Sequence, residues 1–501
     1  MVVRNIFYFY LFIVLFLFSC SNGKKAGPDK PNVLFVYVDD LGYGDPGCYN
    51  PGSKIPTPNI DKLAAEGMVF TDAHAAASIC GPSRYGLLTG RYSWRKPGGL
   101  GNGKAYDECK IEKGRKTIAD MFREEGYNTA QIGKWGLRNN YKQALKDPDR
   151  IPDPDSITPL DFDFSKPIDA PNTRGFDYSF TMVMLAEMRN GKMQKNDKWF
   201  FENGYPYPKG STPDPANFDW ENCLPELAKK GTEYINVYGE KQEGKAFNID
   251  RSKPFFLYFD PHVPHEPIVP TKEFLGSSGA GKYGDFVVEL DHYIGELIKA
   301  LKDNGLYEHT IVIFASDNGA EGTAYNRILK YRHYSNGNLR GAKRDVWEGG
   351  HRVPLIIKWP GKTKAGTKCN TPICFTDLFA TFADHFNYTH DNKTAPDSYS
   401  FLKLLSEPEG EFHRPPIIHH TNRGVMAIRD GDWLYIDAPT GMDNPEPEWF
   451  RKERGVIPSD SPVELFNLKD DLQETRNIAN ERPDKVRELK DKLLMIMKEK
   501  K

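Results

Sequence analysis

The chain has 501 residues, more than one hydrophobic core normally organises, so a large domain with a smaller one is expected. Its 67 Lys and Arg residues against 69 Asp and Glu residues leave a net charge of −2, which excludes a general electrostatic attraction to nucleic acid or to an anionic membrane surface. The aromatic content of 13% and the 37 prolines are typical of a loop-rich globular enzyme and exclude a coiled-coil or disordered chain.

The first twenty residues are predicted to direct export. Arg4 precedes an apolar run from Ile6 to Phe18, which is short for a membrane-spanning helix but suits a signal peptide. The run ends in Leu17-Phe18-Ser19-Cys20, which resembles a bacterial lipobox, with Cys20 as the lipidated residue. We expect a signal over 1–20, a polar tether over 21–30, and a lipoprotein of the periplasm or cell surface, or otherwise a secreted protein. A membrane would then be a partner only through the lipid anchor.

Four short apolar runs are predicted to be buried strands, because they are nearly continuous and not alternating. These runs are Asn32–Val38, Thr129–Ile132, Phe255–Phe259 and Thr310–Ala315. Helices are predicted over Pro58–Gly67 with Thr57 as N-cap, over Thr117–Gly126 with Thr117 as N-cap, and over Thr376–Phe386. This alternation predicts an α/β fold with a large mixed sheet sandwiched by helices.

Two regions depart from this alternation. Residues 138–250 are rich in Pro, Asp, Asn, Gly and aromatic residues, which predicts a long irregular insertion of the kind that lines binding sites. Short alternating pieces between Gly424 and Ile436 precede an amphipathic helix, whose apolar residues are Val486, Leu489, Leu493 and Met497. We expect a main domain over 31–400 and a C-terminal α+β subdomain over 401–501.

Polar residues that a core does not use follow all four predicted strands. They are Asp39-Asp40-Leu41-Gly42-Tyr43-Gly44-Asp45, Gly133-Lys134-Trp135, Asp260-Pro261-His262-Val263-Pro264-His265 and Ser316-Asp317-Asn318-Gly319. Each alone could be a solvated turn, but together they are expected to meet at the carboxyl edge of the sheet, where open α/β folds bind ligands. Asp39, Asp40, Asp317 and Asn318 offer hard oxygen ligands, which suit Ca²⁺ or Mg²⁺ better than zinc.

A cysteine signature stands between the first two strands. Cys80-Gly81-Pro82-Ser83-Arg84, followed by Leu88-Thr89-Gly90-Arg91, resembles the signature by which sulfatases mark a cysteine for oxidation to formylglycine. The D-D-x-G-x-G-D and S-D-N-G motifs match the same family, and the resemblance runs from about Asn32 to Pro354. Weaker similarity continues at Leu465-Phe466-Asn467-Leu468. The chain is identified as similar to the formylglycine-dependent type I sulfatases (arylsulfatase-like) of the alkaline phosphatase superfamily.

The resemblance implies a set of roles. One divalent cation, most often Ca²⁺, would be held by Asp39, Asp40, Asp317, Asn318 and the formylglycine (3-oxoalanine) made from Cys80 by a maturation enzyme. The hydrate of that aldehyde would attack sulfur. Arg84 would steady the hydrate, and Lys134 and Lys343 would hold sulfate oxygens. His265 would contact the sulfate or protonate the departing alcohol, with His262 as the weaker candidate.

The family pattern breaks at one position. Many relatives read G-K-W-H-L-G where this chain has Gly133-Lys134-Trp135-Gly136-Leu137-Arg138. The histidine credited with taking a proton during release of sulfate is therefore absent, so that another base serves or the step is slower. His74 is a nearby alternative base, and Arg138 is predicted to contact the substrate.

The expected function is hydrolysis of a sulfate ester on a carbohydrate, with release of inorganic sulfate and degradation of a sulfated polysaccharide as the setting. Aromatic and amide side chains in the insertion suggest a sugar substrate: Trp199, Phe200, Phe201, Asn203, Tyr205 and Tyr207. Arg327, Arg332 and His333 are candidates for reading a neighbouring acidic group. A phosphodiesterase or phosphonate hydrolase on the same fold and a glycan-binding lipoprotein with a lapsed catalytic site are alternatives.

Seven cysteines occur, at positions 20, 48, 80, 109, 223, 369 and 374. If Cys20 carries lipid and Cys80 is oxidised, an odd number remains, so at least one thiol is expected to be free. A local bridge between Cys369 and Cys374 and a longer one between Cys48 and Cys109 are candidates, and the sequence leaves the pairing open.

Overall fold

The computed structural model describes residues 30–103, 107–149, 161–184, 198–207, 220–239 and 247–499. The predicted signal, Cys20 and nearly all of the tether lie outside these residues. Within the described ranges, no helix combines the length and the apolar character needed to cross a membrane.

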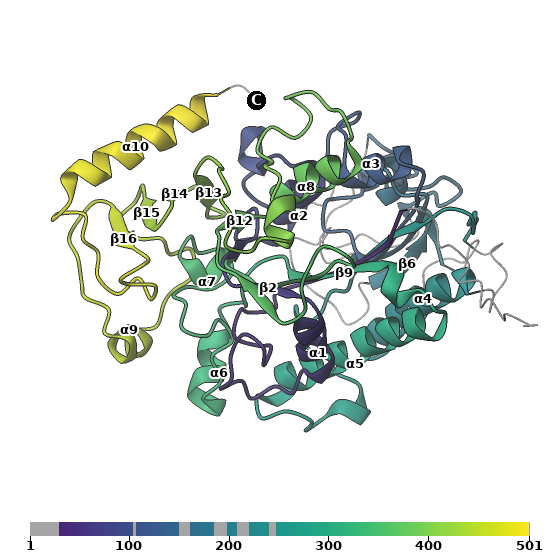
Figure 1. Cartoon of the computed structure of the whole chain (residues 1–501), viewed down its shortest axis with the longest axis horizontal. Helices are drawn as coiled ribbons and strands as arrows, with labels where there is room; N and C mark the ends of the chain where they lie inside the picture. Colours follow the sequence, from purple (N-terminus) through teal and green to yellow (C-terminus); the bar gives the residue numbers. More distant parts are fainter. Residues whose placement is uncertain are drawn as a thin grey trace, which may run out of the picture.

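A mixed ten-stranded sheet forms the centre of the molecule (Figure 1), in the order β11-β2-β10-β9-β1-β8-β4-β5-β6-β7. In that order the strands are Thr367–Cys369, Met68–Phe70, Leu355–Lys358, Thr310–Ser316, Asn32–Val38, Phe255–Asp260, Asn128–Lys134, Tyr178–Met184, Lys198–Glu202 and Tyr205–Pro206. The four strands predicted from sequence are β9, β1, β8 and β4, and they are parallel neighbours. Their carboxyl ends therefore lie along one edge, as predicted.

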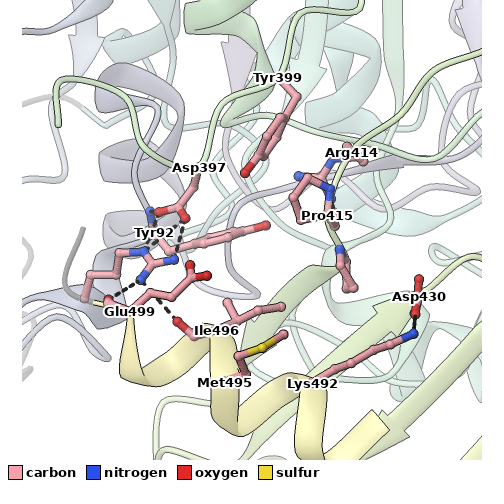
Figure 2. Close-up of a pocket in the computed structure, with 12 residues that line it drawn as sticks. Tyr92, Asp397, Tyr399, Arg414, Pro415, Asp430, Lys492, Met495, Ile496 and Glu499 are labelled. Carbon is pink, nitrogen blue, oxygen red and sulfur yellow. Dashed lines mark hydrogen bonds and ion pairs between the residues drawn. The ribbon is translucent and has the colours of Figure 1, made fainter. Parts of the chain in front are cut away.

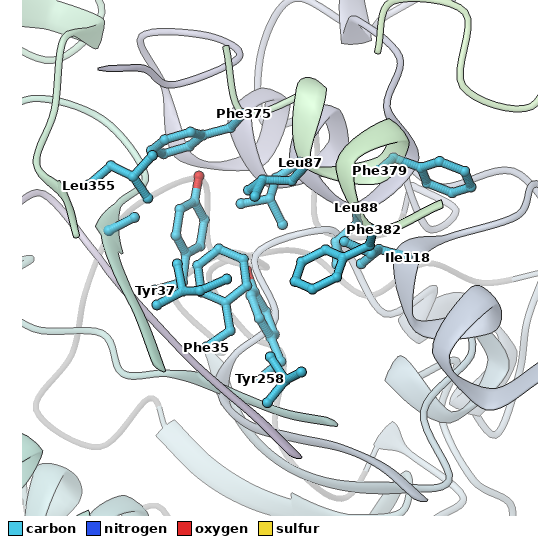
Figure 3. Packing of buried hydrophobic residues seen from close by; sticks show 14 of the residues in the cluster. Phe35, Tyr37, Leu87, Leu88, Ile118, Tyr258, Leu355, Phe375, Phe379 and Phe382 are labelled. Atoms are coloured by element: carbon cyan, nitrogen blue, oxygen red, sulfur yellow. The ribbon is translucent and has the colours of Figure 1, made fainter. Parts of the chain in front are cut away.

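Helices cover both faces of the sheet, so β1 buries side chains on both sides. Val33, Phe35 and Tyr37 face a core shared with α2 (Cys80–Thr89), α3 (Ile118–Glu124) and α8 (Asp377–Phe386) (Figure 3). Leu34, Val36 and Val38 face a second core shared with α1 (Pro58–Glu66), α4 (Cys223–Tyr238) and α5 (Gly281–Asp303). The continuous apolar run of β1 is thus explained by burial on two faces.

The helices are α1 (Pro58–Glu66), α2 (Cys80–Thr89), α3 (Ile118–Glu124), α4 (Cys223–Tyr238), α5 (Gly281–Asp303), α6 (Ala324–Tyr331), α7 (Glu348–His351), α8 (Asp377–Phe386), α9 (Glu448–Arg454) and α10 (Pro483–Lys498). The predicted helices correspond to α1, α3 and α8. Thr117 caps α3 in a reciprocal pair with Asp120. Thr57 makes no such cap on α1, since its hydroxyl bonds Asp61 within the first turn.

The predicted irregular insertion contains more regular structure than expected. It supplies β5, β6 and β7 at the edge of the sheet and the 16-residue helix α4. Two of the predicted sugar contacts pack inside this edge: Phe201 is buried, and Phe200 stacks on Phe180 with ring centroids 4.8 Å apart. These two rings therefore build the sheet edge and do not form an open platform for a sugar. The side chain of Trp199, predicted with them, lies outside the described part of the chain.

The C-terminal region carries a four-stranded antiparallel sheet, β13 (Ile417–His420), β14 (Met426–Asp430), β15 (Trp433–Ile436) and β16 (Glu464–Asn467). Helix α10 buries Leu489 and Leu493 against this sheet. Met497 was predicted on the same face, but it is 40% exposed, because the last turn extends past the sheet.

Histidines join this sheet to the main domain. His74 from β3 (Ala73–His74), His351 from α7 and His419 from β13 are completely buried. The Nδ1 atoms of His74 and His351 lie 3.0 Å apart, and the ring of His419 lies face to face on that of His351 with centroids 3.5 Å apart. Ring-nitrogen lone pairs lie in the ring plane, so those of the stacked pair run side by side and do not converge on a metal ion. The cluster is a packed, hydrogen-bonded junction flanked by Asp72, Glu348 and two arginines, Arg352 and Arg429.

The junction predicts loss of stability in acid. Burial lowers the pKa of all three histidines, that of His351 to about 3, and both ring nitrogens of His419 lack a hydrogen-bond partner. Because the folded-state pKa values lie below the ordinary value of about 6.5, the unfolded chain binds protons first as the pH falls. The stabilisation is complete above about pH 6.5 and is lost as the pH falls toward the folded-state values.

Replacing His419 by Phe should therefore reduce the fall in Tm between about pH 7.5 and pH 5, since one proton uptake on unfolding is removed. Replacing His413, whose side chain is 89% exposed, serves as the control. Equal acid sensitivity of wild type and the His419 variant would count against this account.

The candidate disulfides do not form among the described residues. None of Cys48, Cys80, Cys109, Cys223, Cys369 and Cys374 forms a disulfide. Cys369 ends β11 and points its sulfur at the carbonyl of Pro408, whereas Cys374 lies in β12 (Ile373–Cys374), which pairs with β3 in a separate sheet. The two cysteines therefore belong to different sheets.

Candidate active site

Cys80 is the first residue of α2, at the carboxyl edge of the central sheet. It is 4% exposed, and every residue of α2 is buried. Its sulfur lies in one group with carboxylate oxygens of Asp39 and Asp317, all within 4.8 Å of one another. The structure thus places the signature cysteine against the residues that follow β1 and β9, as predicted.

Arg84 lies one turn further along α2 and ties three strand ends together. Its guanidinium is fully buried and contacts Asp317 Oδ2 at 2.9–3.0 Å, Asp260 Oδ2 at 3.2 Å and the carbonyl of Lys134 at 2.8 Å. A buried cation with partners from β9, β8 and β4 fixes the start of α2 relative to the sheet.

Four oxygen-bearing side chains stand where the carboxyl ends of β1 and β9 meet. Val38 and Ser316 are partners in the ladder, so Asp39 and Asp40 face Asp317 and Asn318. Asn318 Nδ2 donates to Asp40 Oδ1 at 2.7 Å. Asp39 Oδ1 and Asn318 Oδ1 are buried without a hydrogen-bond partner. Buried oxygen atoms without partners are what a bound cation would satisfy, so these residues fit a hard divalent ion.

The electrostatics of the carboxylates support the same interpretation. Burial raises the pKa of Asp317 to about 7, and repulsion from Asp39 and Asp40 contributes, although Arg84 opposes it. Burial alone would also raise the pKa of Asp39, but Lys134, His265 and Arg84 hold it well below its usual range. A divalent cation would offset the repulsion among these carboxylates.

Two lysines complete the ring of charge. Lys134, at the end of β4, lies 2.5 Å from Asp39 Oδ2, and Lys343 lies 2.7 Å from Asp40 Oδ1. Both amines are almost fully buried. Burial would lower the pKa of Lys343, but Asp40 outweighs it and raises the pKa, so the amine stays protonated. Two fixed cations beside a cysteine at a helix start make a pocket for an oxyanion.

His265 is the one predicted histidine that reaches this pocket. Its Nε2 lies 3.8 Å from Asp40 Oδ2, and its Nδ1 bonds the carbonyl of Glu266 at 2.7 Å. Burial, with Lys134 and Lys343 nearby, lowers its pKa to about 4. Its side chain is 25% exposed, so it stands at the boundary between the pocket and solvent.

Other predicted histidines lie elsewhere. His262 is buried between Trp220 and Phe286, with Nδ1 3.7 Å from the sulfur of Cys223. His74 lies in the junction cluster, where Asp72 and His351 engage its two ring nitrogens. Neither side chain contacts Cys80, so the loop position of His262 and the sequence proximity of His74 were misleading.

The predicted contacts with a second acidic group are also corrected. His333 is completely buried, and its ring nitrogens contact Asp45 Oδ1 at 2.7 Å and the backbone N–H of Lys54 at 3.3 Å. Arg327 stacks on Tyr283, 3.6 Å from the ring centroid, and Arg332 pairs with Glu453 at the surface. These residues stabilise the loops around α6 and do not line the pocket.

Sequence reasoning missed Asn102, which contacts Cys80. Asn102 Nδ2 lies 3.4 Å from the sulfur, and Asn102 Oδ1 accepts from the N–H of Gly81 at 3.0 Å. The surrounding Gly101-Asn102-Gly103 reads as an ordinary turn, so no local signal marks it.

A separate cavity of about 360 Å³ lies under α10 (Figure 2). Four of its charged residues pair with one another, Arg95 with Asp397 at 2.7 Å and Lys492 with Asp430 at 2.6 Å, and Arg414 pairs with Asp377 outside the cavity. It shares no lining residue with the pocket at Cys80. Its lining therefore combines structural ion pairs with aromatic and apolar side chains at the C-terminal end of α10.

Comparison with known proteins agrees with this geometry. A family model described as Sulfatase matches residues 31–388. The N-acetylgalactosamine-6-O-sulfatase of Bacteroides thetaiotaomicron is 32% identical over 521 residues, covering 94% of each chain. A solved 6S-sulf structure, described in connection with the metabolism of multiple glycosaminoglycans by the same species, is also similar. It has a TM-score of 0.74 at 30% identity and covers 94% of this chain and 100% of that one. The phosphonate monoester hydrolase of Agrobacterium radiobacter shares the fold alone, with a TM-score of 0.57 at 19% identity over 93% of this chain and 95% of that one.

Proposed function

Because the chain belongs to the sulfatase family and is a sulfuric ester hydrolase, we propose that its substrate is a sulfated carbohydrate, with 6-O-sulfated N-acetylgalactosamine as the first candidate. The observation that carries the proposal is the convergence of Cys80, Arg84, Lys134 and Lys343 on the carboxylates at the ends of β1 and β9. The named sugar is that of the relative matched over nearly its whole length.

Sulfatases generally use a formylglycine and a divalent cation, and we assign both to this pocket. The formylglycine would be made from Cys80 by a maturation enzyme, and Ca²⁺ would be held by Asp39, Asp40, Asp317 and Asn318. The hydrate of the aldehyde would supply the oxygen nucleophile, and the bound cation would supply a fixed positive charge for a sulfate oxygen. The unpartnered oxygens of Asp39 and Asn318 support the cation assignment.

The protein's own residues divide the remaining work. Lys134 and Lys343 would hold sulfate oxygens, and their charge counts most where water is excluded. Arg84 fixes the start of α2 and with it residue 80. The departing alcohol gains its proton from Lys343, whose amine stays protonated beside Asp40. His265 also lies at Asp40, but its pKa of about 4 leaves it neutral near pH 7, so it contacts the sulfate without supplying that proton.

The test is a substrate panel measured by release of inorganic sulfate. We expect hydrolysis of N-acetylgalactosamine 6-sulfate, with weaker hydrolysis of the 4-sulfate, because a pocket that aligns one ester position with residue 80 holds the other out of line. A phosphodiester and a phosphonate monoester test the rival reaction on the same fold. Turnover of these phosphorus esters without sulfate release would overturn the proposal. Binding of sulfated glycans without any hydrolysis, by protein that carries the aldehyde, would also overturn it.

We further propose export as a lipoprotein through Cys20, from the lipobox resemblance at Leu17–Cys20. Cys20→Ala should then move the protein from the membrane fraction to the soluble fraction. Wild type found in the soluble fraction would contradict a lipid anchor.

A further inference from the structure

Position 136, where the sequence departs from the expected histidine, faces the pocket without a side chain. Gly136 has a φ of +69°, a conformation that residues with a Cβ rarely adopt. A Cβ added there would lie 3.0 Å from Cδ and 3.4 Å from Nε of Arg84. A group that serves residue 80 from this side must therefore come from elsewhere in the chain.

Asn102 borders the same space. A Cβ built on Gly81 would lie 2.6 Å from Asn102 Oδ1 and 3.1 Å from the carbonyl oxygen of Gly136, so both positions flank one point beside residue 80. Asn102 Oδ1 accepts from the N–H of Gly81 at 3.0 Å. This bond orients the amide, so that Nδ2 points at the sulfur of Cys80, 3.4 Å away.

The backbone around Asn102 is held by two cations. Arg138, 7% exposed, donates to the carbonyl of Asn102 through Nε and to that of Gly103 through an Nη, each at 2.8 Å. Lys110 donates to the carbonyl of Gly101. Three consecutive carbonyls are therefore fixed above the start of α2. Arg138 was predicted to contact substrate, but these bonds make it a support for this segment.

We propose that Asn102 is a further catalytic residue, which donates a hydrogen bond from Nδ2 to an oxygen on residue 80, and that Arg138 positions it. The sulfur of Cys80 stands in for that oxygen in the structure. The proposal rests on the proposed function, because it requires formylglycine at position 80. An amide takes up no proton near neutral pH, so Asn102 acts by stabilising negative charge on the oxygen and not as a base.

The first test compares Asn102→Ala and Asn102→Asp with wild type. Removing a donor aimed at a developing charge is expected to lower kcat about 100-fold with little change in KM. A second readout needs no turnover: capture of the aldehyde at position 80 by an aminooxy probe, followed by mass spectrometry of the peptide. We expect faster capture in both variants, because the hydrated form loses its hydrogen bond. Asn102→Asp preserves the shape of the side chain and so controls for access of the probe.

Arg138→Met should change both readouts in the same direction by a smaller factor, and should add little in the Asn102→Ala background, because the two residues act as a unit. Asn370→Ala, an exposed amide bonded to Thr71, is the matched control, with Tm measured for every variant. Unchanged kcat and unchanged capture in both Asn102 variants would overturn the role of Asn102 and leave the proposed function standing. An unmodified thiol at position 80 of the wild type would overturn both proposals. An aldehyde at position 80 without sulfate release would overturn the proposed function, but not the hydrogen bond from Asn102.

Discussion

Cys80→Ala is expected to abolish sulfate release, with kcat/KM reduced by at least about 10⁴-fold. The reason is positional as well as chemical. The sulfur at position 80 lies with carboxylate oxygens of Asp39 and Asp317, all within 4.8 Å of one another, and the lysines that make the oxyanion pocket pair with Asp39 and Asp40. Without the nucleophile, the remaining residues can bind sulfate but cannot form a bond to sulfur.

The matched control for this variant is Cys48→Ala, because Cys48 is another free thiol and lies half-buried near α1, away from the pocket. Its loss should leave sulfate release unchanged. The Cys80 variant should fold normally, since a small side chain is replaced by a smaller one at the start of a fully buried helix. Retained sulfate release in correctly folded Cys80→Ala would refute the assignment of the nucleophile.

Removal of the divalent cation by a chelator is expected to lower activity by at least about 100-fold, because a metal ion contributes several kcal/mol to stabilising charge in such a site. Addition of Ca²⁺ should restore activity and raise Tm, since the ion binds only the folded protein. The rise in Tm should be visible even with Cys80 unmodified, because most of the oxygen ligands come from β1 and β9.

Asn318→Ala isolates the contribution of one ligand. Asn318 is uncharged and its Oδ1 has no partner. Its Nδ2 donates to Asp40, but that carboxylate keeps its ion pair with Lys343, so the substitution leaves no buried charge unpaired. We expect the Ca²⁺ concentration needed for half of the Tm rise to increase at least about 10-fold. The control Asp391→Ala removes an exposed carboxylate in a distant turn and should leave this Ca²⁺ concentration unchanged. The same Ca²⁺ response in Asn318→Ala and wild type would place the ion elsewhere.

The sequence predicted the parts of the site that local pattern determines. The runs that became β1 and β9 are apolar throughout because both faces of the sheet are covered, and the polar residues after them must lie at its edge. Parallel pairing of β1 with β9 then brings Asp40 and Asn318 within 2.7 Å of one another. This convergence follows from strand direction, which the α/β alternation already specifies.

The parts that failed depend on tertiary contacts. His333 and Arg327 look like free loop charges until Asp45 and Tyr283, far away in sequence, cover them. Helix α4 was missed because its apolar residues begin directly after a stretch rich in Pro and Asn, although Leu224, Leu227 and Ile235 have helical spacing. Asn102 touches Cys80 from a loop whose backbone bonds Arg138, and no sequence pattern encodes that contact.

The central claim is that residue 80 acts as a formylglycine. Mass spectrometry of the peptide that contains Cys80, from active protein produced together with a maturation enzyme, tests it most directly. We predict an aldehyde in place of the thiol, in a fraction that rises with specific activity of the preparation. Full sulfate release from protein whose Cys80 is entirely an unmodified thiol would contradict the account.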